Sequence, residues 1–238
     1  MHEKKKDKVA IVGMHPRTRD DAPFMDKEFE IWISNEMYGY VPRFDVLWEV
    51  HDFMEFQAKK RNSRHYDWMM DNKEFPIMMS AKFEEIPMCT LIPYDEIIAQ
   101  YGMYITSTAD IMFLCALLWG YEEIHIYGIE MSTKEEEYSI QKASFEHHLG
   151  YAYGLRKATG RPIVYLPKNG ELLKCTNVYG KDGNQRLPYI LLNAKQAAEK
   201  EKIKNELEKI QAAVNESYQR GRIDAINELQ HMVVKDDK

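Results

Sequence analysis

Short apolar runs that separate stretches with helical patterns constrain the fold of this chain more than any other feature. These β-rich runs cover residues 9–13, 30–34, 44–50, 76–79, 123–129 and 163–167. Helices are expected over residues 53–70, 94–101, 111–119 and 142–159. Because strands that alternate with helices build layered α/β domains, the pattern predicts a mostly parallel sheet with helices on both faces.

The composition changes from about residue 193 onward, where glycine becomes rare. Ile203, Leu207, Ile210 and Val214 follow each other at helical spacing, as in a coiled coil, and Gly221 interrupts the pattern before a second apolar set. We therefore expect residues 1–180 to form one domain, 181–192 a linker, and 193–238 a long helix or helical hairpin. Such a stripe needs a covering surface, and we expect a homo-oligomer contact through this segment, with packing on the chain's own body as the alternative.

Charge and cysteine content exclude several classes of protein. Lys plus Arg number 32 and Asp plus Glu 38, so the net charge of −6 excludes a broadly basic nucleic-acid surface, although a local basic groove stays open. The 3 cysteines form no CxxC pair, which argues against a disulfide framework or a zinc ribbon. The apolar runs are too short for a signal peptide or a membrane span, so we expect a cytoplasmic protein.

The loop after the first expected strand is one candidate site. It holds Gly13, His15, Pro16 and Arg17. Ligands of open α/β sheets bind at the carboxyl ends of strands, where a glycine permits close backbone approach and an arginine can pair with phosphate oxygens. The same residues also suit an ordinary turn, and a lone glycine does not make the dinucleotide fingerprint.

A second candidate site is the start of the most apolar helix, at Thr106, Ser107 and Thr108. Free N–H groups, hydroxyls and the positive end of the helix dipole converge at such a start. The segment predicts either a phosphate or ribose site or a plain N-terminal cap.

The strand expected over residues 123–129 leads to a third candidate site. It ends at Gly128 and Glu130, where a carboxylate can accept hydrogen bonds from sugar hydroxyls. Tyr138 and Gln141 follow in a segment that we expect to be a loop able to close over a ligand.

The neighbouring histidines His147 and His148 lie in an expected helix. Successive helical residues point about 100° apart, so the two rings would not easily chelate one ion, and we expect no metal site. A single histidine here suits a general base, because imidazole titrates near neutral pH.

The order of these motifs resembles the core of the family 42 sialyltransferases. In that family an Ile-Thr-Ser-Gly turn precedes an apolar helix, a Gly-Tyr-Lys-Glu-Ile strand and a Ser-Gly-Ile-Asp end. The corresponding stretches here are residues 105–108, 120–124 and 127–130. The likeness covers roughly residues 8–174. The chain is also similar to uncharacterised bacteriophage proteins that share the Pro-x-x-Arg-Asp-x-Ala-Pro opening seen at residues 16–23.

The family resemblance implies a Rossmann-like domain that binds a cytidine-monophosphate sugar. By that resemblance, Gly13 and Asn35 approach the nucleotide, while Thr106 and Ser107 hold ribose or phosphate. Tyr138 takes the place of a tyrosine that stabilises the leaving phosphate.

The family's catalytic histidine has no counterpart at the aligned position, which holds Gln141 or Lys142. The nearest histidine along the chain is His147.

Our leading hypothesis from the sequence is a glycosyltransferase-like enzyme that needs no metal. His147 or His15 would take the proton of the attacking acceptor hydroxyl, and Tyr138 with the helix start would stabilise the departing phosphate. If the bacteriophage likeness extends to function, we expect the protein to act in the bacterial host cytoplasm. The acceptor could then be a modified nucleobase in place of a glycan. The acidic charge balance argues against a DNA acceptor. The alternatives are a non-catalytic oligomer that sequesters a nucleotide and a structural protein that retains only the fold.

Overall fold

The strands form one seven-stranded sheet in which all neighbouring strands run parallel. The computed structural model describes residues 3–51, 63–131, 136–174 and 198–211, together with residues 216 and 220. The strands are β1 (Lys8–Val12), β2 (Phe29–Ser34), β3 (Val46–Glu49), β4 (Ile77–Met79), β5 (Cys89–Leu91), β6 (Glu123–Tyr127) and β7 (Ile163–Tyr165). The predicted α/β fold with a parallel sheet is therefore confirmed.

The strand order β5-β4-β3-β2-β1-β6-β7 places β1 at the point where the winding direction reverses. The chain proceeds outward from β1 to β5 and then returns to add β6 on the other side of β1. In open α/β sheets, ligands bind at the carboxyl ends of the strands beside such a reversal. The parallel register aligns Val12 with Ile33 of β2 and with Tyr127 of β6, so the loops after these three strands begin at the same level.

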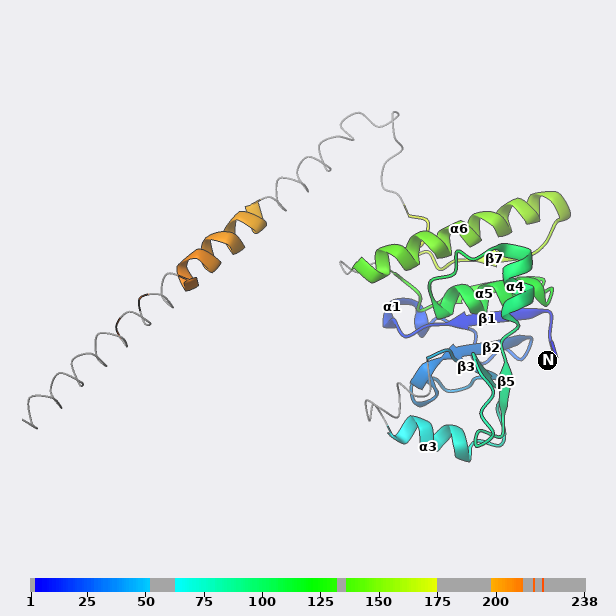
Figure 1. Cartoon of the computed structure of the whole chain (residues 1–238). Helices are drawn as coiled ribbons and strands as arrows, with labels where there is room; N and C mark the ends of the chain where they lie inside the picture. Colours follow the sequence, from blue (N-terminus) through cyan, green and yellow to red (C-terminus); the bar gives the residue numbers. More distant parts are fainter. Residues whose placement is uncertain are drawn as a thin grey trace, which may run out of the picture. The chain divides into compact units, whose positions relative to one another are not determined.

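Helices cover both faces of the sheet (Figure 1). They are α1 (Pro16–Arg19), the 3-10 helix η1 (Asn35–Gly39), α3 (Ser63–Asp71), α4 (Tyr94–Tyr101), α5 (Thr108–Leu118) and α6 (Glu136–Thr159). In α5 and α6, Phe113 and Phe145 pack with Trp32 in one core, while Met69 of α3 belongs to the core on the opposite face. Because the central strands are buried on both faces, their sequences are nearly continuous apolar runs.

Several elements differ from the sequence-based expectation. Helix α1 occupies what we expected to be a tight turn, and the short edge strand β5 was not expected. Helix α6 begins at Glu136, so the loop predicted through Gln141 is wrong; the acidic residues at the start of α6 suit a helix N-terminus. The helix expected over residues 53–70 is described only from residue 63, since residues 52–62 lie outside the described part of the chain.

The chain divides into two compact units, Met1–Lys174 and Cys175–Lys238. In the second unit, residues 198–211 are helical, and their side chains are exposed. The apolar stripe predicted there includes Ile203, Leu207 and Ile210, with exposed fractions of 55%, 60% and 60%. The predicted linker at 181–192 and the second apolar set after Gly221 lie outside the described residues.

Candidate functional site

The loops after β1 and β6 meet through a pair of glycines. The Gly13 amide donates to the Tyr127 carbonyl at 2.8 Å, and the His15 amide donates to the Gly128 carbonyl at 2.9 Å. A Cβ atom on Gly13 would lie only 2.5 Å from the Gly128 oxygen. Gly128 itself has φ +63°, a conformation that side chains disfavour. In the structure, the lack of a side chain at Gly13 lets the backbone of the loop after β6 come close to the loop after β1.

A buried carboxylate lies beside this glycine pair. Glu130 is 3% exposed, and its Oε1 accepts a hydrogen bond from the Thr18 hydroxyl of α1 at 3.0 Å. The same hydroxyl oxygen accepts from the Gly128 amide at 2.8 Å, so Thr18 links the two loops. Within the described part of the chain, Glu130 Oε2 has no hydrogen-bond donor, although the Arg17 guanidinium lies 3.6 Å away and pairs with Glu171.

A second buried acceptor lies on the other side of β1. Asn35 follows β2 directly and adopts φ 54°, a left-handed conformation that asparagine tolerates better than most residues. Its Oδ1 atom is buried and has no donor among the residues that the structure describes. The carboxyl ends of β6 and β2 therefore each carry a buried oxygen that no described residue supplies with a hydrogen bond, and the end of β1 lies between them.

The start of α5 has the plain N-terminal cap that the sequence offered as the alternative to a phosphate site. The Ser107 hydroxyl accepts from the Asp110 amide at 3.1 Å and donates to Asp110 Oδ2 at 2.9 Å. That carboxylate oxygen also accepts from the Thr106 amide at 3.0 Å. The amides of Thr108 and Ala109 have no acceptor among the described residues, so they stay available to a ligand.

Helix α6 is joined to this helix start by its buried side chains. The Ser144 hydroxyl and His148 Nε2 both donate to the Tyr104 carbonyl, at 2.7 Å and 2.8 Å. Burial raises the pKa of Asp110, against the lowering effect of its hydrogen bonds from Thr106 and Ser107. Burial lowers the pKa of His148, so this histidine is neutral at pH 7 and acts as a structural link.

His147, the histidine singled out as a base, is exposed on α6, and its ring lies 5.8 Å from that of Tyr104. The structure thus brings His147 to the segment that leads into α5. His15 is the N-cap of α1: its Nδ1 accepts from the Arg17 amide at 3.3 Å, and Pro16 begins the helix.

Gln141 and Tyr138 both belong to α6. Gln141 is half-buried, whereas the Tyr138 side chain lies outside what the structure describes.

Another buried polar cluster at the carboxyl edge contains no residue named as a candidate from the sequence. Glu49, the last residue of β3, is 1% exposed. Its Oε1 lies 2.8 Å from His51 Nδ1 and 3.0 Å from the His51 amide, and its Oε2 lies 2.9 Å from Nε2 of the buried His65 on α3. His65 Nδ1 in turn contacts the Tyr38 hydroxyl at 3.3 Å. Glu49 near the end of the strand expected over residues 44–50, with His51 directly after that strand, was the available signal for this cluster.

The electrostatics of this cluster favour an ionised carboxylate. Burial raises the pKa of Glu49, but hydrogen bonds from His51 and His65 outweigh that effect and leave the pKa below its ordinary value. A charge kept in a buried place by two imidazoles is typical of positioning groups in functional sites.

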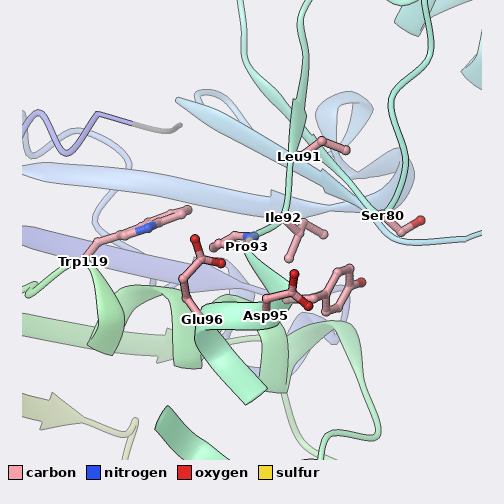
Figure 2. Close-up of a pocket in the computed structure, with 8 residues that line it drawn as sticks. Ser80, Leu91, Ile92, Pro93, Asp95, Glu96 and Trp119 are labelled. Atoms are coloured by element: carbon pink, nitrogen blue, oxygen red, sulfur yellow. The ribbon is translucent and has the colours of Figure 1, made fainter. Parts of the chain in front are cut away.

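A pocket of about 430 Å³ lies where β5 leads into α4 (Figure 2). Its lining residues are Ser80, Leu91, Ile92, Pro93, Tyr94, Asp95, Glu96 and Trp119. Trp119 also packs against Trp32 and Trp48, with ring centroids 5.4 Å and 5.9 Å away. The two carboxylates make this pocket unsuited to phosphate groups, and no predicted site residue lines it.

Neither a candidate metal site nor a membrane-spanning helix occurs in the part of the chain that the structure describes. No cluster of three or more His, Cys, Asp or Glu side chains suited to a metal ion lies among the described residues. No helix in that same part of the chain is long and apolar enough to cross a membrane.

Comparison with known proteins finds similarity in solved structures alone. No protein-family model and no curated protein sequence matches the chain. The α-2,3-sialyltransferase of Campylobacter jejuni in its apo form is 14% identical with a TM-score of 0.44, covering 83% of this chain and 97% of that one. The monofunctional α-2,3-sialyltransferase Cst-I of the same organism is 12% identical with a TM-score of 0.45, covering 84% and 97%.

The sialyltransferase CstII from C. jejuni, in complex with the substrate analogue CMP-3FNeuAc, is 17% identical with a TM-score of 0.43 and covers 66% of this chain and 78% of that one. These values describe a distant likeness, and no residue role is taken from it. The chain thus resembles sialyltransferases in solved structures, as the order of its motifs predicts.

Proposed function

We propose that the protein binds a nucleotide sugar at the carboxyl edge of the sheet around β1 and transfers the sugar to an acceptor hydroxyl. The observation that carries the proposal is a pair of buried oxygens, Glu130 Oε2 and Asn35 Oδ1, that accept no hydrogen bond from any residue the structure describes. A buried acceptor without a hydrogen bond costs about 1–3 kcal/mol, so native proteins rarely keep one without a reason. Here a ligand rich in donors removes that cost at both ends.

The spacing of the two oxygens suits a nucleoside. They follow β6 and β2, which flank β1, and neighbouring strands lie about 4.8 Å apart, so the two strand ends are separated by about 10 Å. A carboxylate beside the winding reversal accepts hydrogen bonds from ribose hydroxyls. Glu130 takes that role in the proposal, and Asn35 accepts from an amino group of the base, such as that of cytosine.

Groups that suit a phosphate lie at the same edge. The Arg17 side chain is 42% exposed and already faces the Glu130 carboxylate, so its guanidinium can pair with a phosphate oxygen. The available amides of Thr108 and Ala109 provide further donors at the start of α5. The sequence supplies His15 and His147 as bases for the acceptor hydroxyl, and Tyr138 as a donor to the departing phosphate.

Calorimetric titration with CMP and a panel of nucleotide sugars tests the binding site. Glu130→Gln places an amide N–H₂ where the ligand hydroxyl donates, and a lost hydrogen bond to a charged group is worth about 1.5–3 kcal/mol. We therefore expect the nucleotide Kd to rise about 10- to 150-fold. The matched control is Glu122→Gln, at the amino end of β6, where the glutamate pairs with Arg161 and the Kd is expected to stay unchanged.

Chromatographic detection of released nucleotide tests transfer. Tight binding without release would favour the sequestering alternative. Absence of binding by the wild-type protein, or an unchanged Kd in Glu130→Gln, would refute the proposed site.

A further inference from the structure

We propose that residues 198–211 form a parallel helical bundle with the same segment of two or three further copies of this chain. The segment, drawn in orange in Figure 1, is a helix of the second unit. Ile203, Leu207 and Ile210 form an apolar stripe along it, and among the described residues of that unit nothing covers their side chains. The width of this stripe, the charges beside it and the residue types within it together identify what covers it.

The stripe is as narrow as the seam of a coiled coil. Its spacings of four and three residues place Leu207 at heptad position a, and Ile203 and Ile210 at position d. A helix that packs on the body of a globular protein has a wider apolar face, in which position e or g is apolar as well. Here Lys204 at position e and Glu206 at position g are charged. The stripe therefore fits another helix with the same repeat better than it fits a broad surface.

The charges beside the seam make the segment complementary to itself in a parallel arrangement. When two such helices run parallel, position g of one faces position e in the next heptad of the other. Glu199, at position g, then faces Lys204 of a neighbouring copy. In an antiparallel pair position g faces position g, so Glu199 would meet Glu206 and the like charges would repel each other. The charges thus favour a second copy of this chain, and they favour the parallel orientation.

The residue types in the seam favour more than two copies. β-Branched residues at position a with leucine at position d favour two strands, whereas leucine at a with isoleucine at d favours three or four. The second arrangement is the one seen here, with Leu207 at a between Ile203 and Ile210 at d. Lys200, at the preceding a position, costs stability but fixes the register of the helices. Its long apolar stem lets the ammonium group extend toward water at the rim of the bundle.

Sedimentation equilibrium of the full chain across the micromolar range tests the association. The expected mass is three or four times that of one chain. A wild-type protein that stays monomeric, as packing of the stripe on the chain's own body would leave it, overturns the association. A dimer overturns the arrangement of three or four helices.

Two charge reversals test the pairing between copies. Glu199→Lys leaves lysine at both of the paired positions, whereas Lys204→Glu leaves glutamate at both. Each variant alone is expected to associate at least about tenfold more weakly than wild type, because an attraction becomes a repulsion at every contact between helices. An equimolar mixture of the two variants is expected to associate more strongly than either variant alone, since the lysines of one chain then face the glutamates of the other.

Matched controls carry the same charge changes on the outward face of the helix. Glu208→Lys at position b and Lys202→Glu at position c are expected to leave the association unchanged. Equal weakening by these controls would show that net charge governs the association, and would overturn the proposed pairing. Wild-type masses for both reversals would show that the copies meet through another surface, and would overturn the bundle.

The sign of the effect of Glu199→Lys also tests the orientation of the helices. In an antiparallel arrangement the new lysine would face Glu206, so the variant would associate more strongly than wild type. That result would overturn the parallel arrangement. Neither measurement involves a nucleotide, so the bundle can be confirmed or rejected whatever the outcome for the proposed function.

Discussion

Replacing Gly13 by alanine would place a methyl carbon against the loop that follows β6. Its Cβ would lie 2.5 Å from the Gly128 oxygen and 2.7 Å from Cγ1 of Ile129, whereas favourable contacts between such atoms are about 3.5–4 Å long. One of the obstructing atoms is backbone, so the two loops must separate. We expect Gly13→Ala to lower the free energy of unfolding by about 3 kcal/mol, at the upper end of the cost of overpacking.

The matched control for this prediction is Gly150→Ala. Gly150 lies inside α6 and is exposed, and a methyl carbon added there would meet nothing within 4 Å beyond the helix itself. Alanine is the better helix former, so this change is expected to raise the free energy of unfolding by about 0.5–1 kcal/mol. The two identical substitutions should thus change stability with opposite sign.

Urea denaturation followed by circular dichroism measures both effects. For a domain of this size, 3 kcal/mol corresponds to a fall in Tm of about 6–12 °C. A loss below about 1 kcal/mol in Gly13→Ala, with an unchanged denaturant slope, would show that the loops are not held by this backbone contact.

Three further changes test other parts of the structure. Thr18→Val removes the hydroxyl that joins Glu130 to the Gly128 amide, and we expect a loss of about 2 kcal/mol in urea denaturation, with wild-type stability as the contrary result. Because the pKa of Glu49 is lowered in the folded protein, its ionised carboxylate adds to the free energy of unfolding at pH values above the ordinary pKa of 4.5. That stabilisation is lost as the pH falls through the pKa of the folded state. The stability difference between wild type and Glu49→Gln should therefore shrink below pH 4.5, and a difference independent of pH would contradict this. Leu207→Lys places a charge in the exposed stripe of residues 198–211, and light scattering should show a lower mass than for a wild-type oligomer; equal masses would reject association through this stripe.

The parts of the fold that follow local rules were predictable from the sequence. Strands β1 to β3 are buried on both faces, so they appear as apolar runs whatever their partners are. Helix α4 matches its predicted bounds because Pro93 precedes it and Gly102 ends it with φ 84°. The three-residue strand β5 has no comparable pattern, since it forms only when β4 offers a free edge.

The site could be predicted only in part, because its members come from separate elements. Glu130 follows a recognisable strand, and its position after that strand indicated a ligand group. The link from Glu49 to His65 depends on how β3 meets α3, which no local pattern records. Asp110 was obscured by the apolar residues around it, although its place three residues after Ser107 is typical of a helix cap.

The three packed indoles on one face of the sheet give the protein an optical signal of its own. Trp32, Trp48 and Trp119 lie within 5.9 Å of one another by ring centroids, close enough for their electronic transitions to couple. Because Trp119 also lines the pocket between β5 and α4, a molecule entering there would alter both emission and near-ultraviolet dichroism. Occupancy of that pocket can thus be followed without a label.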